Sequence, residues 1–257
     1  HVLREDEGNV RGRMLDQLKD VYALSGGLAG NINVTRIQIF DEDGVALSGE
    51  EFVIGDKAIS SPNTEFRSYA RVDQAALPDG RIAIVVQTRQ EEPGPGIFSY
   101  DNRILILSES GAVETTLDLE VGSASSSQVR VTAVPEGGFL VTWNETPIGG
   151  STQGYARLFD TSGRQLFERR ELSANLNGSN DIIALADGSF AIARAGQSGP
   201  GVLSVEIVGA DGSTIVPNQV IGAGDPVFNA LNSVVDAAAL DDGTFVMGWA
   251  TQYDNQT

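Results

Sequence analysis

The stretch Ala133-Val-Pro-Glu-Gly-Gly-Phe-Leu-Val-Thr-Trp143 contains the pattern that decides the fold. An acidic residue followed by glycine supplies the positive φ that a tight connection between strands requires. After the turn, Phe139, Val141 and Trp143 recur at the two-residue period of a β-strand. The stretch therefore predicts a β-hairpin.

This hairpin pattern occurs four times, and a second hairpin pattern alternates with it along the chain. The turn glycines of the first type recur at spacings of 57, 51 and 55 residues, and they are Gly80, Gly137, Gly188 and Gly243. The second type is an apolar strand followed by a glycine turn, and its glycines are Gly44, Gly111, Gly163 and Gly212. Chance does not produce such strict alternation, so we predict a repeat protein.

Two hairpins in each period of about 50 residues make a four-stranded antiparallel unit, which needs neighbours to cover its faces. We therefore predict an all-β fold, a β-propeller built from four-stranded antiparallel blades of about 50 residues. Complete blades are expected at about 71–122, 128–175 and 180–222. A fourth blade starts at Ser233 and stops after two strands, near Thr251.

The hairpin at roughly 32–55 offers the two outer strands that the fourth blade lacks. Two interpretations follow from this count. Either the two ends of the chain pair in one blade, or the chain is part of a larger propeller.

A helix is predicted ahead of the repeats. The apolar positions between Glu7 and Leu24 fall at helical spacing, and they are Met14, Leu15, Leu18, Val21 and Tyr22. Gly26 and Gly27 follow the run, where glycines commonly end a helix. The predicted organisation is a helical segment over 1–29, which caps the propeller or continues from an upstream domain, and propeller repeats over 30–257.

The composition excludes several classes of function. The 257 residues include 17 Lys and Arg against 35 Asp and Glu, which gives a formal net charge of -18. DNA, RNA and anionic membrane surfaces require cationic partners, so we expect no nucleic acid as partner. No apolar run reaches the roughly 18 residues of a membrane-spanning helix, so no membrane insertion is expected.

Cysteine is absent and His1 is the only histidine, which narrows the chemistry further. The sequence offers no disulfide, thiol nucleophile, His-based zinc site or Ser-His-Asp triad. Any catalysis would use Asp, Glu, Tyr or Arg side chains.

The chain starts without Met and without a charged-then-apolar leader, which indicates a processed or excised segment. Lys19 and Lys57 are its lysines, and arginine supplies the remaining positive charge. An acidic, lysine-poor, cysteine-free surface is typical of an extracellular or salt-exposed bacterial protein. The alternative is that the charge serves solubility alone.

The motif at 133–143, together with Ala-Arg-Leu-Phe-Asp-Thr-Ser-Gly at 156–163, resembles the propeller-type repeats of very large secreted or surface-attached bacterial proteins. The resemblance covers about 32–257. It implies an extracellular or cell-surface location and no defined reaction. Such proteins often carry calcium-binding nonapeptide repeats elsewhere, and those nonapeptides are absent from this chain.

One repeat position stands out as a candidate site. Six residues before each turn acid of the first hairpin type lie Asp73, Arg130, Asp181 and Asp236. Around a propeller axis, three carboxylates and one guanidinium would bind a cation or a sugar through hydrogen bonds. A more specific form of the sugar-binding hypothesis is a glycosidase in which a pair of these carboxylates acts as acid and base. The structural alternative is that each Asp accepts backbone hydrogen bonds and ties blades together.

Three further features have a functional and a structural interpretation. Tyr100, in the long loop 89–102, is a candidate for stacking on a sugar ring or for anchoring its own loop. Asp41-x-Asp43-Gly44 faintly suggests a calcium loop, although an acidic hairpin turn explains it better, and we predict no metal site. Trp143 and Trp249 are predicted to lie in the core rather than to bind ligands.

These observations favour a non-catalytic structural or recognition module of a secreted or cell-surface bacterial protein, with a role in adhesion. Its partner would be protein or carbohydrate at a propeller face, and no cofactor is expected, with Ca²⁺ as the one alternative. The alternatives are a polysaccharide-acting propeller enzyme that uses paired carboxylates from Asp73, Asp181 and Asp236, and a scaffold subunit bound through the helix and the acidic rim.

Overall fold

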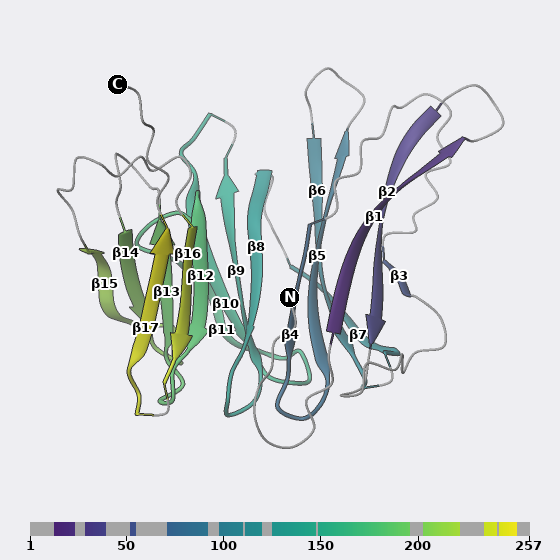
Figure 1. Cartoon of the computed structure of the whole chain (residues 1–257). Coiled ribbons are helices and arrows are strands. Elements are labelled where there is room, and N and C mark those ends of the chain that lie inside the picture. The colour runs from purple at the N-terminus through teal and green to yellow at the C-terminus, as the bar shows by residue number, and fades with distance from the viewer. Residues whose placement is uncertain are drawn as a thin grey trace. The chain divides into compact units, whose positions relative to one another are not determined.

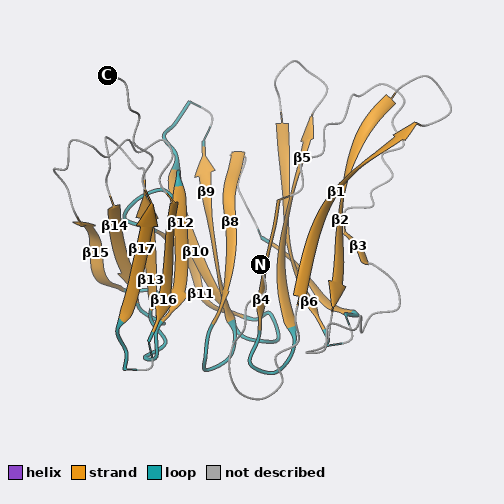
Figure 2. Ribbon diagram, viewed as in Figure 1, coloured by secondary structure: helices purple, strands orange, loops and turns teal. Residues whose placement is uncertain are grey.

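The structure, a computed structural model, describes residues 13–23, 29–39, 52–54, 71–91, 98–109, 111–119, 125–147, 149–195, 203–221, 234–240 and 242–250. All regular secondary structure in these ranges is β-strand, and none of it is helical (Figure 2). The strands form five sheets, and every pairing is antiparallel between strands that are consecutive in the chain (Figure 1). The all-β prediction is confirmed.

Three of the sheets have four strands, as the repeat pattern predicts. Repeat sheet 1 contains β4 (Arg71–Ala76), β5 (Ile82–Glu91), β6 (Phe98–Leu107) and β7 (Val113–Asp118). Repeat sheet 2 contains β8 (Ser125–Ala133), β9 (Phe139–Thr146), β10 (Gln153–Phe159) and β11 (Gln165–Glu171). Repeat sheet 3 contains β12 (Ser179–Ala184), β13 (Phe190–Ala195), β14 (Leu203–Val208) and β15 (Thr214–Ile221).

The remaining sheets are smaller. The N-terminal sheet has three strands, β1 (Arg13–Ala23), β2 (Ala29–Ile39) and β3 (Phe52–Ile54), with β2 between the other two. The half sheet has two, β16 (Val234–Ala239) and β17 (Phe245–Ala250). The predicted two-stranded fourth unit and the pairing within the 32–55 hairpin are therefore both present.

The predicted N-terminal helix is wrong, because residues 13–23 form β1. This strand pairs with β2 along its whole length, from Arg13 opposite Ile39 to Ala23 opposite Ala29. Short apolar spacings such as Leu15 to Leu18 suit a helix locally, but β2 is rich in β-branched residues and offers a ladder partner. Long-range pairing overrides a weak local preference. Gly26 and Gly27, which we interpreted as the helix end, lie outside the described residues.

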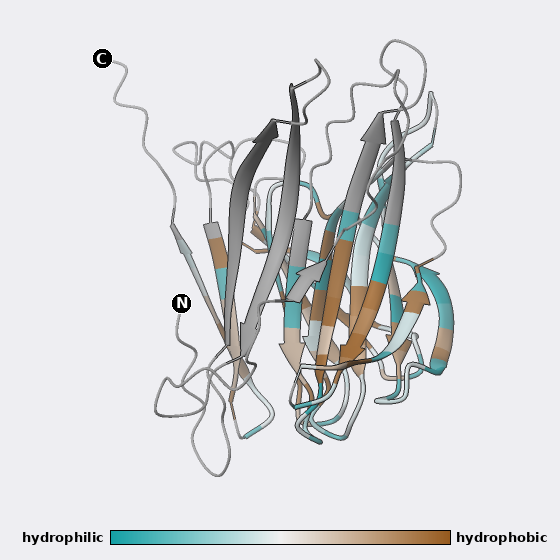
Figure 3. Ribbon diagram, turned by 90° about the vertical axis from the view of Figure 1, so that its right-hand side faces the viewer, coloured by the Kyte–Doolittle hydropathy of each residue, from teal (hydrophilic) through white to brown (hydrophobic). Residues whose placement is uncertain are grey.

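The chain divides into two compact units. The first unit contains residues 1–74 and 80–125, and the second contains residues 75–79 and 126–257. In the second unit, a core cluster joins repeat sheets 2 and 3 through side chains that include Leu140, Leu158 and Phe190. Two smaller clusters join repeat sheet 3 to the half sheet, with Val235, Ala237, Phe245 and Met247 as the half-sheet members. Hydrophobic residues are concentrated on the strands (Figure 3).

Candidate functional site

The candidate position Asp181 lies on β12, where this strand contacts β16 of the half sheet. The backbone N–H of Ala237 donates to Asp181 Oδ2 at 2.7 Å, and the N–H of Ile182 donates to Oδ1 at 2.9 Å. Two residues away, the N–H of Val235 donates to Ser179 Oγ at 3.0 Å. Both carboxylate oxygens of Asp181 are thus occupied by backbone donors, one of them on the neighbouring sheet.

The pKa of the Asp181 carboxyl is raised above its ordinary value. Burial is the largest cause, and the hydrogen bonds from Ala237 and Ile182 oppose it. A side-chain hydrogen bond with Asp236, and the charge of Asp236, raise the pKa further. The structure therefore brings two of the candidate residues, Asp181 and Asp236, near each other.

The other candidate residues lie on sheets other than that of Asp181. Asp236 is exposed on β16, and Arg130 is exposed on β8 of repeat sheet 2. Asp73 is half-buried on β4 and belongs to the first unit. Tyr100 lies on β6 opposite Arg89, and its side chain is outside the described residues.

The turn acids of the hairpins have a structural task. Asp187 Oδ1 accepts hydrogen bonds from the backbone N–H and the hydroxyl of Ser189, at 3.0 and 2.5 Å. Asp242 receives the same two bonds from Thr244. The hydrogen bonds from Ser189 and Thr244 lower the pKa values of these two carboxyls. Each acid thus stabilises its own turn as a carboxylate.

Repeat sheet 3 contains a buried ion pair that the sequence patterns do not predict. Arg194 Nη2 lies 2.7 Å from Glu206 Oε2, and neither side chain is exposed. Glu206 Oε1 also accepts from the N–H and the hydroxyl of Ser173, at 2.9 and 2.8 Å, and Arg194 Nη1 donates to Asn218. Burial lowers the pKa of Arg194, and the charge and hydrogen bond of Glu206 oppose this.

A sequence signal for this pair did exist. Arg194 stands four residues after Phe190, as Trp143 stands four residues after Phe139, so a charge occupies a core position of the repeat. Because the pair fixes Ser173 in the connection between sheets, we interpret it as structural.

The same repeat position in sheet 2 holds an aromatic cluster. Trp143 is fully buried, its Nε1–H donates to Glu145 at 2.7 Å, and its ring stacks on Tyr155 with centroids 6.0 Å apart. Arg169 lies 3.8 Å from the centroid of Tyr155 and pairs with Glu145 at 2.8 Å. The core prediction is confirmed for Trp143.

The core prediction is wrong for Trp249, whose side chain is 50% exposed. Trp249 lies on β17, and within the described ranges the half sheet consists of β16 and β17. No described strand there provides a counterpart of Tyr155, which stacks on Trp143 in repeat sheet 2.

Within the described ranges, no three His, Cys, Asp or Glu side chains come together in a way that would hold a metal ion. The calcium-loop candidate at Asp41 and Asp43 lies outside those ranges. The described residues also contain no helix of a length and hydrophobicity that would cross a membrane.

The sheets and the Asp181 site together define the class, an all-β repeat protein in which polar side chains connect one antiparallel sheet to the next. No protein-family model matches the chain, and no curated protein matches its sequence. Among solved structures, an endo-arabinase from Bacteroides thetaiotaomicron is similar over 92% of both chains, at 12% identity and a TM-score of 0.45. That similarity carries no argument about activity here.

Proposed function

We propose that this chain is a non-catalytic structural and recognition module, built as a β-propeller whose blades are the repeat sheets. Three four-stranded sheets with the same strand order support the architecture. In the second unit, apolar clusters between successive sheets support it as well, because each sheet needs a neighbour to cover its face.

The state of Asp181 carries the non-catalytic part of the proposal. Its two oxygens accept backbone hydrogen bonds from Ile182 and Ala237, the second of which lies on the neighbouring sheet. The carboxyl groups of a retaining glycosidase stand about 5–5.5 Å apart, and those of an inverting one farther, so that a sugar or water fits between them. Because backbone donors hold both oxygens of Asp181, this carboxyl is not free to act as the nucleophile or acid of such a pair.

The setting that we propose is a secreted or surface-attached bacterial protein with a role in adhesion, with carbohydrate or protein as the partner and no cofactor. The acidic, cysteine-free composition supports this setting, since the module needs neither disulfides nor a nucleic-acid partner.

A polysaccharide panel tests the proposal directly. The purified chain is incubated with microbial, algal and plant polysaccharides, and retention and new reducing ends are scored in the same samples. We expect no new reducing ends with any polymer, and retention on a polymer would identify the ligand class. New reducing ends that disappear in the Asp181→Asn variant would overturn the proposal in favour of an enzyme. Without retention on any polymer, the carbohydrate partner is rejected in favour of a protein partner.

A further inference from the structure

The connection between β11 and β12 contains the one Asn-Gly pair of the sequence, Asn177-Gly178. Both residues are exposed, and neither belongs to a strand. Because glycine has no side chain to shield its backbone nitrogen, this nitrogen can approach the amide carbon of the preceding asparagine closely. The pair is therefore a candidate site for a covalent change that needs no enzyme.

Both members of the pair have a structural role. Gly178 has a φ of 81°, which a residue with a side chain adopts only with strain. Asn177 Oδ1 accepts a hydrogen bond of 2.9 Å from Nδ2 of Asn144, a fully buried residue of β9. The N–H of Leu176 donates to Asn144 Oδ1 at 2.6 Å, which fixes the orientation of the Asn144 amide. The pair thus lies where the connection is attached to repeat sheet 2.

We propose that Asn177 is a site of spontaneous deamidation in the folded protein. The backbone nitrogen of Gly178 attacks Cγ of Asn177, a bond forms between these two atoms, and the Cγ–Nδ2 bond breaks. Nδ2 leaves as ammonia and takes up the proton that the Gly178 nitrogen has lost. Water then opens the resulting succinimide at one of its two carbonyl carbons, which gives an aspartyl or an isoaspartyl residue at position 177. One water is consumed, and the reaction requires no oxidant or cofactor.

The hydrogen bonds of the connection favour reaction at Asn177 over reaction at Asn175. Asn144 Nδ2 donates to Asn177 Oδ1, which is the oxygen that gains negative charge when Cγ is attacked. No described residue accepts a hydrogen bond from the N–H of Gly178. For Asn175, the attacking nitrogen would be that of Leu176, whose N–H is bonded to Asn144 and whose side chain shields it.

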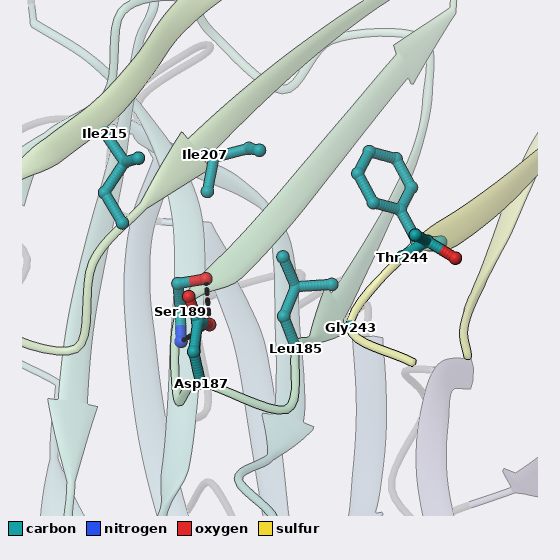
Figure 4. A pocket seen from close by; sticks show the side chains of 8 residues that line it. Leu185, Asp187, Ser189, Ile207, Ile215, Gly243 and Thr244 are labelled. Atoms are coloured by element: carbon teal, nitrogen blue, oxygen red, sulfur yellow. Dashed lines mark hydrogen bonds between the residues drawn. The ribbon is translucent and has the colours of Figure 1, made fainter. Parts of the chain in front are cut away.

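The Asp-Gly turns of the hairpins, which could rearrange through the same succinimide, are held differently. The N–H of Gly188 donates to the carbonyl oxygen of Leu185 at 3.0 Å, and Asp187 accepts from Ser189 (Figure 4). The N–H of Gly243 makes the same turn bond at 3.1 Å. A nitrogen whose proton is held in a hydrogen bond is a poorer nucleophile, so the Asp187 turn serves as an internal control.

The two products differ in their effect on the connection. An aspartyl residue keeps a side-chain oxygen where Asn144 Nδ2 donates in the structure. An isoaspartyl residue directs the main chain through the former side chain, which lengthens the backbone and moves the acceptor. We therefore expect the isoaspartyl product to break the contact with Asn144 and to loosen the connection between repeat sheets 2 and 3.

One tryptic peptide of the full chain reports on all these positions, because residues 171–194 include Asn175, Asn177 and Asp187. The native protein is incubated at pH 7 and at pH 9, and circular dichroism verifies that it stays folded. Mass spectrometry with fragmentation of the peptide then locates the mass gain of deamidation. A sample digested at time zero corrects for deamidation during digestion.

We expect deamidation of Asn177 to be at least about tenfold faster than that of Asn175, which corresponds to about 1.4 kcal/mol in the barrier. It should be faster at pH 9, because the attacking nitrogen must lose its proton. The variant Asn177→Gln, which would have to close a larger ring, should show no gain at position 177. Equal rates at Asn175 and Asn177, or no gain at either residue, would overturn the proposal.

Thermal unfolding tests the consequence for the connection. Anion exchange separates the deamidated chain, which carries one more negative charge, and Asn177→Asp represents the aspartyl product alone. We expect Asn177→Asp to keep the Tm of the native chain and the isoaspartyl fraction to unfold at a lower temperature. An isoaspartyl fraction with the native Tm would contradict the role of the Asn144 contact. None of these outcomes depends on a ligand, so they are independent of the proposed function.

Discussion

Arg194 and Glu206 form an ion pair with no exposed atoms in either side chain. Removing one partner leaves the other charge buried without compensation, which typically costs about 3–5 kcal/mol. We therefore expect Arg194→Met to lower the free energy of unfolding by about that amount, as measured by urea denaturation.

The double variant Arg194→Met/Glu206→Leu is the control for this pair. It removes both charges together, and apolar replacement of a buried ion pair is often neutral or stabilising. We expect the double variant to regain most of the lost stability. If it is less stable than Arg194→Met alone, then the bonds of Glu206 to Ser173, rather than the unpaired charge, dominate the energetics.

Asp181 makes stability depend on pH in a direction opposite to that of an ordinary paired carboxylate. Because its pKa is raised in the folded state, its contribution is fully present below the unfolded value of 3.8 and is lost as the pH rises through the folded pKa. The free energy of unfolding of the native chain should therefore fall, relative to that of Asp181→Asn, as the pH rises from 4. Urea denaturation at a series of pH values measures this difference.

Asp236→Asn is the companion variant for the pH series. It removes the neighbouring charge and leaves the burial of Asp181 unchanged, so the pH trend should weaken without disappearing. Parallel pH curves for the native chain and for Asp181→Asn would show that the carboxyl keeps its ordinary pKa.

At the scale of elements, the connection between β11 and β12 lies close against β10. The N–H of Leu172 donates to the carbonyl oxygen of Gly154 at 2.9 Å, and a Cβ on Gly154 would stand 2.6 Å from the carbonyl oxygen of Ala174. We expect Gly154→Ala to reduce stability by about 1–3 kcal/mol, since the backbone must shift. Thermal unfolding followed by circular dichroism measures the change.

Gly248→Ala is the matched control, because Gly248 also lies within a strand and a Cβ there meets nothing within 4 Å. Its expected effect is small, within about 0.5 kcal/mol or slightly stabilising. Equal losses for both glycines would mean that the close approach at Gly154 is not the cause.

At the scale of the whole molecule, repeat sheets 2 and 3 share one core. Phe190 has no exposed surface and belongs to the cluster that joins these sheets. We expect Phe190→Ala to cost about 3–5 kcal/mol. Hydrogen exchange should show lost protection in both sheets, because each covers a face of the other. Protection lost from sheet 3 alone would contradict the shared core, and Leu166→Ala, at a site 49% exposed, is the neutral control.

The sequence predicted the sheets better than it predicted the site. Turn acids, turn glycines and alternating apolar positions act over a few residues, so the hairpins around Gly137, Gly188 and Gly243 could be located directly. Residues 13–23 were misassigned because their apolar spacing fits a helix, and only the ladder with β2 decides for a strand. Repeat alignment selects Asp181 and Asp236, but it does not indicate which backbone groups donate to Asp181.

By itself the sequence determined the class of the fold and the alternating antiparallel hairpins of the repeat sheets, because turn chemistry and strand periodicity are local properties. Only the tertiary structure decided that the Asp181 carboxylate accepts hydrogen bonds from Ile182 and Ala237, that Arg194 is paired with Glu206, and that Trp249 is exposed on β17. The bond from Ala237 and the bonds between Glu206 and Ser173 depend on residues far away in the chain. A local pattern cannot specify such partners, since burial depends on what the rest of the chain places over each strand.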